Sequence, residues 1–155
     1  MDSDDEFYMK LALAEAQKAY DKAEVPIGAV VVKGDEVIAR SHNLREKLAD
    51  PTAHAEILAI KEAANTLGDW RLYNCTIYVT VEPCVMCAGA LVQARVERLV
   101  YGTADLKAGA AGSILDLVQF SDFNHQLEVK SAILEDECKD IMESFFQDLR
   151  QGKIN

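Results

Sequence analysis

The spacing of apolar and polar positions along the chain switches between a helical and an extended pattern. Ala-rich sequence and 3.6-residue spacing predict helices, and short runs of apolar, often β-branched residues predict strands. In chain order we expect a helix over 3–20, strands over 27–32 and 37–39, a helix over 52–67, a strand over 76–81, a helix over 83–95, a strand over 96–101, a weaker strand over 127–133 and a helix from 135. This alternation is typical of a layered α/β domain.

Capping and turn residues indicate several of these boundaries. Ser3 and Glu6 fit a capping box at the first helix, and Thr52 is the expected N-cap of the second. Gly34-Asp35 is a hairpin turn signal, and Pro83 suits the first position of the third helix. The last helix carries one apolar stripe, made up of Cys138, Ile141, Met142, Phe145 and Leu149.

The length and composition are those of one folded domain. The chain has 155 residues, of which 50% are hydrophobic and 27% charged, so we expect a single domain over 1–155. No apolar run approaches the roughly 20 residues that a membrane span needs. The acidic residues 1–6 do not resemble a signal peptide. These features predict a cytoplasmic protein with no membrane partner.

The net charge of −10 argues against a general nucleic-acid binder, because phosphate contacts require Lys and Arg. The acidic residues are concentrated in 1–24 and 116–148, whereas 25–115 is almost neutral and the last seven residues are basic. A local basic surface is therefore compatible with this sequence, and a broadly basic face is not.

Two short segments carry the candidate chemistry. His54-Ala55-Glu56 opens one predicted helix, and Cys84 and Cys87 share a face at the start of the next. A helix N-terminus favours the thiolate form of Cys, which is the form that binds metal. Two thiolates and one imidazole suit Zn²⁺ and leave its fourth position open for a water molecule. Glu56 is placed to exchange protons with that water without being a ligand.

Two other interpretations of the cysteines are weaker. A redox Cys-x-x-Cys pair does not need a His-x-Glu partner, and a structural zinc would require a fourth Cys or His nearby. The spare cysteines are Cys75, which opens a predicted strand, and Cys138, which lies on the apolar stripe of the last helix. Catalytic zinc is the favoured interpretation.

The H-x-E and P-C-x-x-C segments together resemble the signature of the zinc-dependent nucleobase deaminases. Cytidine, deoxycytidylate, guanine and riboflavin-pathway deaminases share that signature. The resemblance to the bacterial tRNA adenosine deaminases goes further and covers most of residues 5–150. The matching segments are 24–30, 50–56, 79–90, the Asp-x-Lys-x-Gly-Ala-Ala-Gly-Ser loop of 105–113, and Asn124-His125. The 105–113 loop with the downstream Asn-His is the feature most particular to the tRNA enzymes.

This resemblance implies a three-layer α/β/α fold with a central five-stranded mixed sheet, a homodimer, and conversion of adenosine to inosine at the wobble position of an arginine tRNA anticodon. It implies that Glu56 moves protons and that one Zn²⁺ per chain is held by His54, Cys84 and Cys87. For the tRNA anticodon stem-loop it implies the contact residues Asn43, Ala55 (through its backbone amide), Asp105, Lys107, Asn124, His125, Phe146 and Arg150. Phe145 also falls there, but its place on the apolar stripe favours core packing. The acidic last helix departs from the family pattern.

Three rival functions follow from the same residues. A deaminase acting on a free base or nucleotide would differ in the 105–113 loop. A non-catalytic partner subunit would be expected to lack Glu56, which is present, and a zinc-stabilised binding module would close the metal's coordination sphere. A homodimer is also favoured by the helix over 83–95, which is apolar nearly all round, although core burial within one chain explains that pattern almost as well.

Overall fold

The computed structural model describes the backbone of residues 2–154 and the side chains of residues 4–154. Its elements in chain order are α1 (Asp2–Asp21), β1 (Gly28–Lys33), β2 (Glu36–His42), α2 (Ala55–Leu67), β3 (Cys75–Val81), α3 (Val85–Gln93), β4 (Arg98–Thr103), β5 (Glu128–Lys130) and α4 (Glu135–Arg150). Each predicted helix and strand is present, and the weak fifth strand is confirmed as a shorter one.

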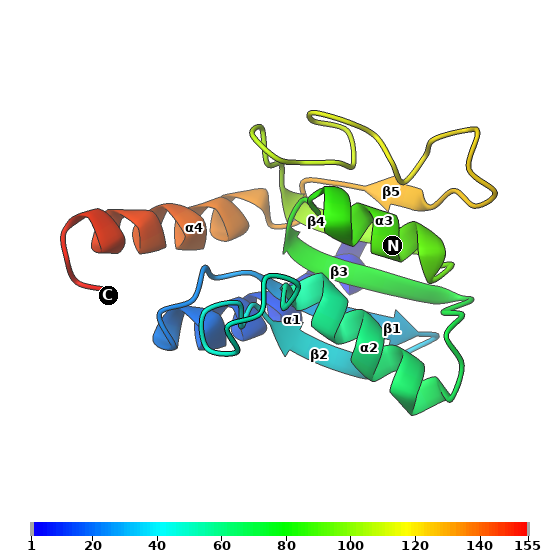
Figure 1. Cartoon of the computed structure of the whole chain (residues 1–155), viewed down its shortest axis with the longest axis horizontal. Helices are drawn as coiled ribbons and strands as arrows, with labels where there is room; N and C mark the ends of the chain where they lie inside the picture. Colours follow the sequence, from blue (N-terminus) through cyan, green and yellow to red (C-terminus); the bar gives the residue numbers. More distant parts are fainter. Residues whose placement is uncertain (1, 155) are drawn as a thin grey trace.

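The five strands form one mixed sheet in the order β2-β1-β3-β4-β5. The hairpin is confirmed, because β1 pairs antiparallel with β2 across the turn at Gly34-Asp35, where Gly34 has a positive φ. β1 is also antiparallel to β3, whereas β3, β4 and β5 are parallel to one another. The carboxyl ends of β2, β3 and β4 therefore lie along the same edge of the sheet (Figure 1).

Helices cover both faces of the sheet, which confirms the three-layer architecture (Figure 1). Successive strand residues point to opposite faces. On one face, Val31 and Ile77 pack in a core with apolar residues of α2 and α3. On the other face, Val30 and Tyr78 pack with residues of α1 and α4, including Met9. Burial of both faces explains why β1 and β3 are almost continuously apolar.

A buried carboxylate ties α1 to the sheet. Asp5 is 1% exposed and accepts two hydrogen bonds from Arg98, at 2.8 and 2.7 Å. The Tyr78 hydroxyl donates to it at 2.8 Å, and the Lys130 ammonium lies 3.1 Å away. Burial alone would raise the pKa of Asp5, but these donors and the charge of Arg98 lower it well below its usual range. Asp5 is thereby held as a carboxylate that links α1 to β3, β4 and β5.

Two predicted helix starts are wrong. α2 begins at Ala55 with His54 as its N-cap, so Thr52 does not cap it. The Asp50 carboxylate accepts hydrogen bonds from the Thr52 backbone amide and hydroxyl, so Thr52 belongs to a local turn before the helix. Pro83 likewise precedes Cys84, the N-cap of α3, and is outside the helix. Both shifts place a metal-ligand candidate at the cap.

The remaining expectations about the helices have mixed outcomes. α1 begins at Asp2, and the capping box at Ser3 lies outside the described side chains. On α4, Cys138 and Phe145 are buried as predicted, but Leu149 is 43% exposed because the C-terminal end of this helix extends beyond the sheet (Figure 1). Among the described residues, no helix combines the length and apolar character that crossing a bilayer requires.

Candidate active site

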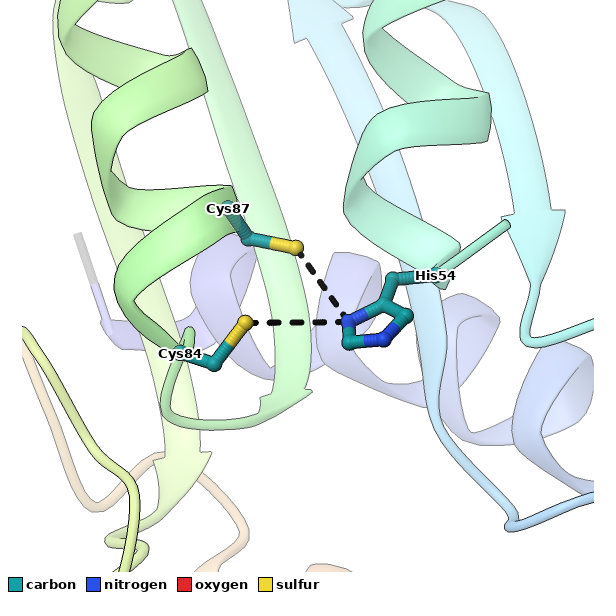
Figure 2. Close-up of side chains that lie close together, drawn as sticks. All are labelled: His54, Cys84 and Cys87. Carbon is teal, nitrogen blue, oxygen red and sulfur yellow. Dashed lines mark hydrogen bonds between the residues drawn. The ribbon is translucent and has the colours of Figure 1, made fainter. Parts of the chain in front are cut away.

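Three side chains from two separate segments meet at the carboxyl edge of the sheet. His54 is the N-cap of α2, Cys84 is the N-cap of α3, and Cys87 lies one turn into α3. Figure 2 shows the two sulfur atoms directed at one nitrogen of the imidazole ring. The Nδ1 atom of His54 lies 3.7 Å from Sγ of Cys84 and 3.6 Å from Sγ of Cys87. The ligand atoms of the three residues all lie within 4.8 Å of one another.

These separations fit the edges of a zinc coordination tetrahedron. With Zn–S near 2.3 Å and Zn–N near 2.05 Å, tetrahedral geometry places the sulfur and nitrogen ligands about 3.6 Å apart. Hydrogen bonding alone would not explain why both sulfur atoms lie near the same nitrogen, since that nitrogen can form only one such bond. The donor set of one imidazole and two thiols therefore suits Zn²⁺, with Nδ1 as the histidine ligand atom and one position open.

The two cysteines differ in their protonation. A hydrogen bond from the Cys87 thiol lowers the pKa of Cys84 to about 5, and the backbone amides of Cys87 and Met86 at the start of α3 add to that effect. The same hydrogen bond to Cys84, together with burial, raises the pKa of Cys87. Cys84 is therefore ready to act as a thiolate, and Cys87 would lose its proton if a metal cation were bound between the two sulfurs.

Glu56 lies beside this cluster at the start of α2 and is 4% exposed. Burial raises the pKa of Glu56 to about 7, and the negative charge of Cys84 contributes in the same direction. Its own backbone amide and the Cys87 thiol oppose this shift by donating hydrogen bonds. A carboxyl group with a pKa near neutrality can both take up and release a proton, which is the property that a general acid–base requires.

A groove of about 1060 Å³ opens at the same edge of the sheet, where β3 and β4 end. Its floor includes Val81 and Thr103, and α4 forms one of its walls. Four cationic and three acidic or aromatic side chains line it: Arg45, Lys107, Lys139, Arg150, Asp105, Glu143 and Phe146. The groove is therefore locally basic in a protein whose net charge is −10.

Asn43 and Ala55 do not line this groove. Asn43 is 6% exposed; its Nδ2 donates to the Val25 carbonyl at 3.3 Å, and its Oδ1 accepts from the Arg45 amide at 3.2 Å. These bonds fix the amide group next to Val25 and Arg45, which both line the groove. Ala55 is fully buried as the first residue of α2, directly after the ligand candidate His54.

Four of the predicted RNA-contact residues line the groove. These are Asp105, Lys107, Phe146 and Arg150, and their contact with RNA stays a prediction. Phe145 instead packs edge-to-face against Tyr20 in the interior, in agreement with its place on the apolar stripe.

Asn124 and His125 lie elsewhere. The ring of His125 donates from Nε2 to the Val96 carbonyl at 2.6 Å, and Val96 precedes the amino end of β4. The cluster lies at the carboxyl end of the parallel neighbour β3, so these two residues are at the opposite end of the sheet from it (Figure 1). Within one chain, the fold does not bring them to the groove, and their contact with substrate stays a prediction.

Three further residues at this edge are absent from the sequence-based expectations. Arg45 and Lys139 line the groove, and the Glu82 side chain is buried beneath the 105–113 loop. Glu82 carries a sequence signal, since an acidic residue directly after a buried strand needs a local set of donors. Arg45 and Lys139 carry none, because exposed cations on a loop and a helix are ordinary.

Comparison with known proteins agrees with this geometry. A family model described as MafB19-like deaminase matches residues 3–150. A tRNA-specific adenosine deaminase of Bacillus subtilis is 54% identical over 149 residues, which are 96% of this chain and 92% of the relative. A protein of the same description from Aquifex aeolicus is 43% identical over 96% of this chain and 98% of its own length.

Two solved structures of deaminases also match this chain. One from a study of A-to-I editing by tRNA:A34 deaminases at the wobble position matches with a TM-score of 0.84 and 46% identity, over 87% of this chain and 98% of the other. A guanine deaminase from Bacillus subtilis matches with a TM-score of 0.63 and 37% identity, over 70% of this chain and 69% of the other. The chain therefore belongs to the tRNA-specific adenosine deaminases, within the MafB19-like deaminase family.

Proposed function

We propose that this enzyme converts adenosine to inosine at the wobble position of a tRNA anticodon, with one Zn²⁺ per chain. The observation that carries this proposal is the convergence of His54, Cys84 and Cys87 beside the buried Glu56, on the same edge of the sheet as a locally basic groove. Relatives that share most of the chain are described as tRNA-specific adenosine deaminases, which supports the choice of reaction and substrate.

His54, Cys84 and Cys87 would hold the metal. Bound Zn²⁺ supplies Lewis acidity, which lowers the pKa of water so that it can attack C6 of adenine near neutral pH. Glu56 would take one proton from the attacking water and deliver it to the ring nitrogen. It would then take the second proton from the hydroxyl group now bound to C6 and deliver it to the amino group, which leaves as ammonia. Its raised pKa suits both directions of transfer, because neither the acid nor the carboxylate is strongly disfavoured.

The groove would receive the anticodon loop. Single-stranded loops present splayed bases, which proteins recognise by stacking and hydrogen bonding. Phe146 is 38% exposed and available for stacking, and the cations Arg45, Lys107, Lys139 and Arg150 are placed to contact phosphates. Asn43, the Ala55 amide and Asp105 are the proposed hydrogen-bonding contacts to bases. Asp148, part of the unusually acidic last helix, accepts a hydrogen bond from Tyr20, so its charge is directed at α1.

Three finer statements belong to the same proposal. An arginine tRNA is the proposed substrate, and the cytoplasm, where tRNA functions, is the proposed location. A homodimer is proposed through the outer face of α3. Cys87, Ala88, Leu91 and Val92 of this helix are buried against the sheet, whereas Val85 is 54% exposed and Met86 and Ala90 are half-buried. An apolar face of this kind would be covered by a second copy of the chain.

The substrate assignment is tested with purified, zinc-loaded enzyme. Anticodon stem-loops of a panel of tRNAs that carry adenosine at the wobble position are incubated with it and sequenced for inosine, beside free adenosine and guanine. We expect inosine at the wobble position of the arginine stem-loop and far slower turnover of the free compounds. Equal or faster turnover of guanine or free adenosine would replace this proposal with a small-substrate deaminase, the alternative that the guanine deaminase match favours.

A further inference from the structure

Glu82 is a second buried glutamate at the active-site edge, and the proposed reaction does not use it. It directly follows β3, is 3% exposed, and stands two residues before Cys84. Its backbone amide donates to the Thr103 carbonyl at 2.9 Å, which fixes the residue to the end of β4. The side chain is therefore held between the ends of two central strands.

The Glu82 carboxylate accepts four hydrogen bonds, all from the loop that follows β4. Oε1 accepts from the Asp105 amide at 3.0 Å and from the Ser113 hydroxyl at 2.5 Å. Oε2 accepts from the amides of Ala111 and Ser113, at 3.0 and 3.1 Å. These donors span the whole 105–113 loop, so one side chain ties together its beginning, middle and end.

The loop is folded closely around this carboxylate. A Cβ atom added to Gly109 would lie 2.3 Å from Cδ of Glu82 and 2.5 Å from the Asp105 carbonyl oxygen. Only glycine fits at this position without moving the carboxylate or the loop backbone. The Ala110 amide donates to the Pro83 carbonyl at 2.8 Å, so the loop is also attached to the residue before the ligand candidate Cys84.

We propose that Glu82 is a positioning residue, whose carboxylate holds the 105–113 loop in the shape that presents Asp105 and Lys107 to the RNA beside the metal cluster. This inference rests on the proposed function for the identity of the substrate. The loop amides that Glu82 binds include the amide of Asp105 itself. Loss of the anchor frees the wall of the groove and leaves the cluster intact, so binding suffers more than chemistry.

Glu82→Gln tests this proposal, because it keeps the shape of the side chain and replaces one acceptor oxygen with an amide that cannot accept. We expect an approximately tenfold rise in KM for the stem-loop, as for loss of a charge-assisted hydrogen bond, with kcat changed less than about threefold. Zinc content should equal that of the wild type. Glu97→Gln, at an exposed position, is the matched control and should change neither constant.

Amide hydrogen exchange gives a second measurement that needs no substrate. In Glu82→Gln the amides of Asp105, Ala111 and Ser113 should exchange about tenfold faster than in the wild type, with β1 and β3 unchanged. Ser113→Ala removes only the hydroxyl donor and should shift KM and exchange in the same direction by about threefold, which keeps the test valid if Glu82→Gln folds poorly.

The outcomes separate the two claims. Unchanged loop exchange and unchanged KM in both variants would overturn the positioning role of Glu82, as would loss of zinc from Glu82→Gln. If the 105–113 loop exchanged faster in Glu82→Gln but the wild type did not deaminate the stem-loop, the proposed function would be wrong and the anchoring role of Glu82 would be supported.

Discussion

Glu56 and Glu82 are two buried glutamates at one edge of the same sheet, and their surroundings give them opposite properties. Glu56 sits beside two sulfur atoms, and burial raises its pKa to about 7. Burial alone would also raise the pKa of Glu82, but the Ser113 hydroxyl and three backbone amides lower it. The carboxylate of Glu82 is surrounded by donors, whereas that of Glu56 receives few.

This difference shows that the supply of hydrogen-bond donors decides what a buried carboxyl group can do. A carboxylate with four donors has no acceptor capacity left for a reacting water molecule and acts as a fixed anchor. A carboxyl group with few donors keeps its proton available near neutral pH. Both are glutamates near a helix start in the sequence, and only the loop that folds over Glu82 distinguishes them.

The largest expected effect concerns the metal that we propose beside Glu56. Cys87→Ser should reduce bound zinc from about one per chain to a small fraction and abolish turnover, because a hydroxyl is a poor zinc ligand. Glu56→Ala should retain zinc, since His54, Cys84 and Cys87 already form the cluster. Metal analysis of the purified proteins by mass spectrometry measures both. Stoichiometric loss of zinc from Glu56→Ala would show that Glu56 is a ligand and remove its contrast with Glu82.

Asp5 extends the comparison to a buried carboxylate supplied with cations. Its pKa is lowered, so it contributes stability that is present above the unfolded-state pKa near 4 and is lost as the pH falls further. We expect Asp5→Asn to lower the free energy of unfolding by about 3 kcal/mol at pH 6, because it leaves Arg98 and Lys130 without their shared partner.

Urea unfolding of metal-free wild type and Asp5→Asn at pH 6 and pH 3 measures this. The difference between the two proteins should shrink at pH 3, since protonation then costs the wild type part of the same interaction. An equal difference at both pH values would mean that the charge of Asp5 does not stabilise the fold.

The two active-site glutamates should respond to neutralisation with opposite signs. Because the pKa of Glu56 is raised, its ionisation destabilises the folded state as the pH rises from about 4 towards 7. Metal-free Glu56→Gln should therefore be more stable than the wild type at pH 8 by about 2 kcal/mol, and this gain should shrink towards pH 5. Glu82→Gln should be less stable by about 2 kcal/mol, because it disrupts charge-assisted hydrogen bonds. Denaturant unfolding of both variants measures these changes in the free energy of unfolding. If both variants shifted it in the same direction relative to the wild type, the proposed difference between Glu56 and Glu82 would be wrong.

The smallest expected effect tests whether the anchored loop contacts RNA phosphates. Lys107→Ala should weaken stem-loop binding and reduce the slope of log K against log salt by about one. Binding titrations at several salt concentrations measure the slope, with Lys33→Ala, an exposed lysine outside the groove, as the control. An unchanged slope would show that Lys107 does not contact a phosphate.

Much of this fold could be predicted from local patterns, and the reasons for the exceptions are physical. The Val-rich strands and the hairpin at Gly34-Asp35 have unambiguous periodicity and turn chemistry. The N-cap of α2 is His54 and not the predicted Thr52, because Thr52 donates to Asp50 in a local turn, a competition that propensity does not resolve.

In the candidate active site, too, some features could be predicted from local sequence and others could not. The metal cluster follows from two short motifs, because each places its ligands at a helix start. The role of Glu82 depends on a loop that begins 23 residues later, and the separation of His125 from the cluster depends on the direction of β4. Such long-range relations are set by tertiary structure. The local sequence indicates that Glu82 needs hydrogen-bond donors, but it does not indicate which segment supplies them.

The most direct test of the central claim is inosine formation in an arginine anticodon stem-loop by the wild type and Glu56→Gln at equal zinc content. We expect inosine at the wobble position with the wild type and a rate about a thousandfold lower with the variant, within the range for loss of a general acid–base. A variant that forms inosine at the wild-type rate, or a zinc-loaded wild type that forms none, would contradict it.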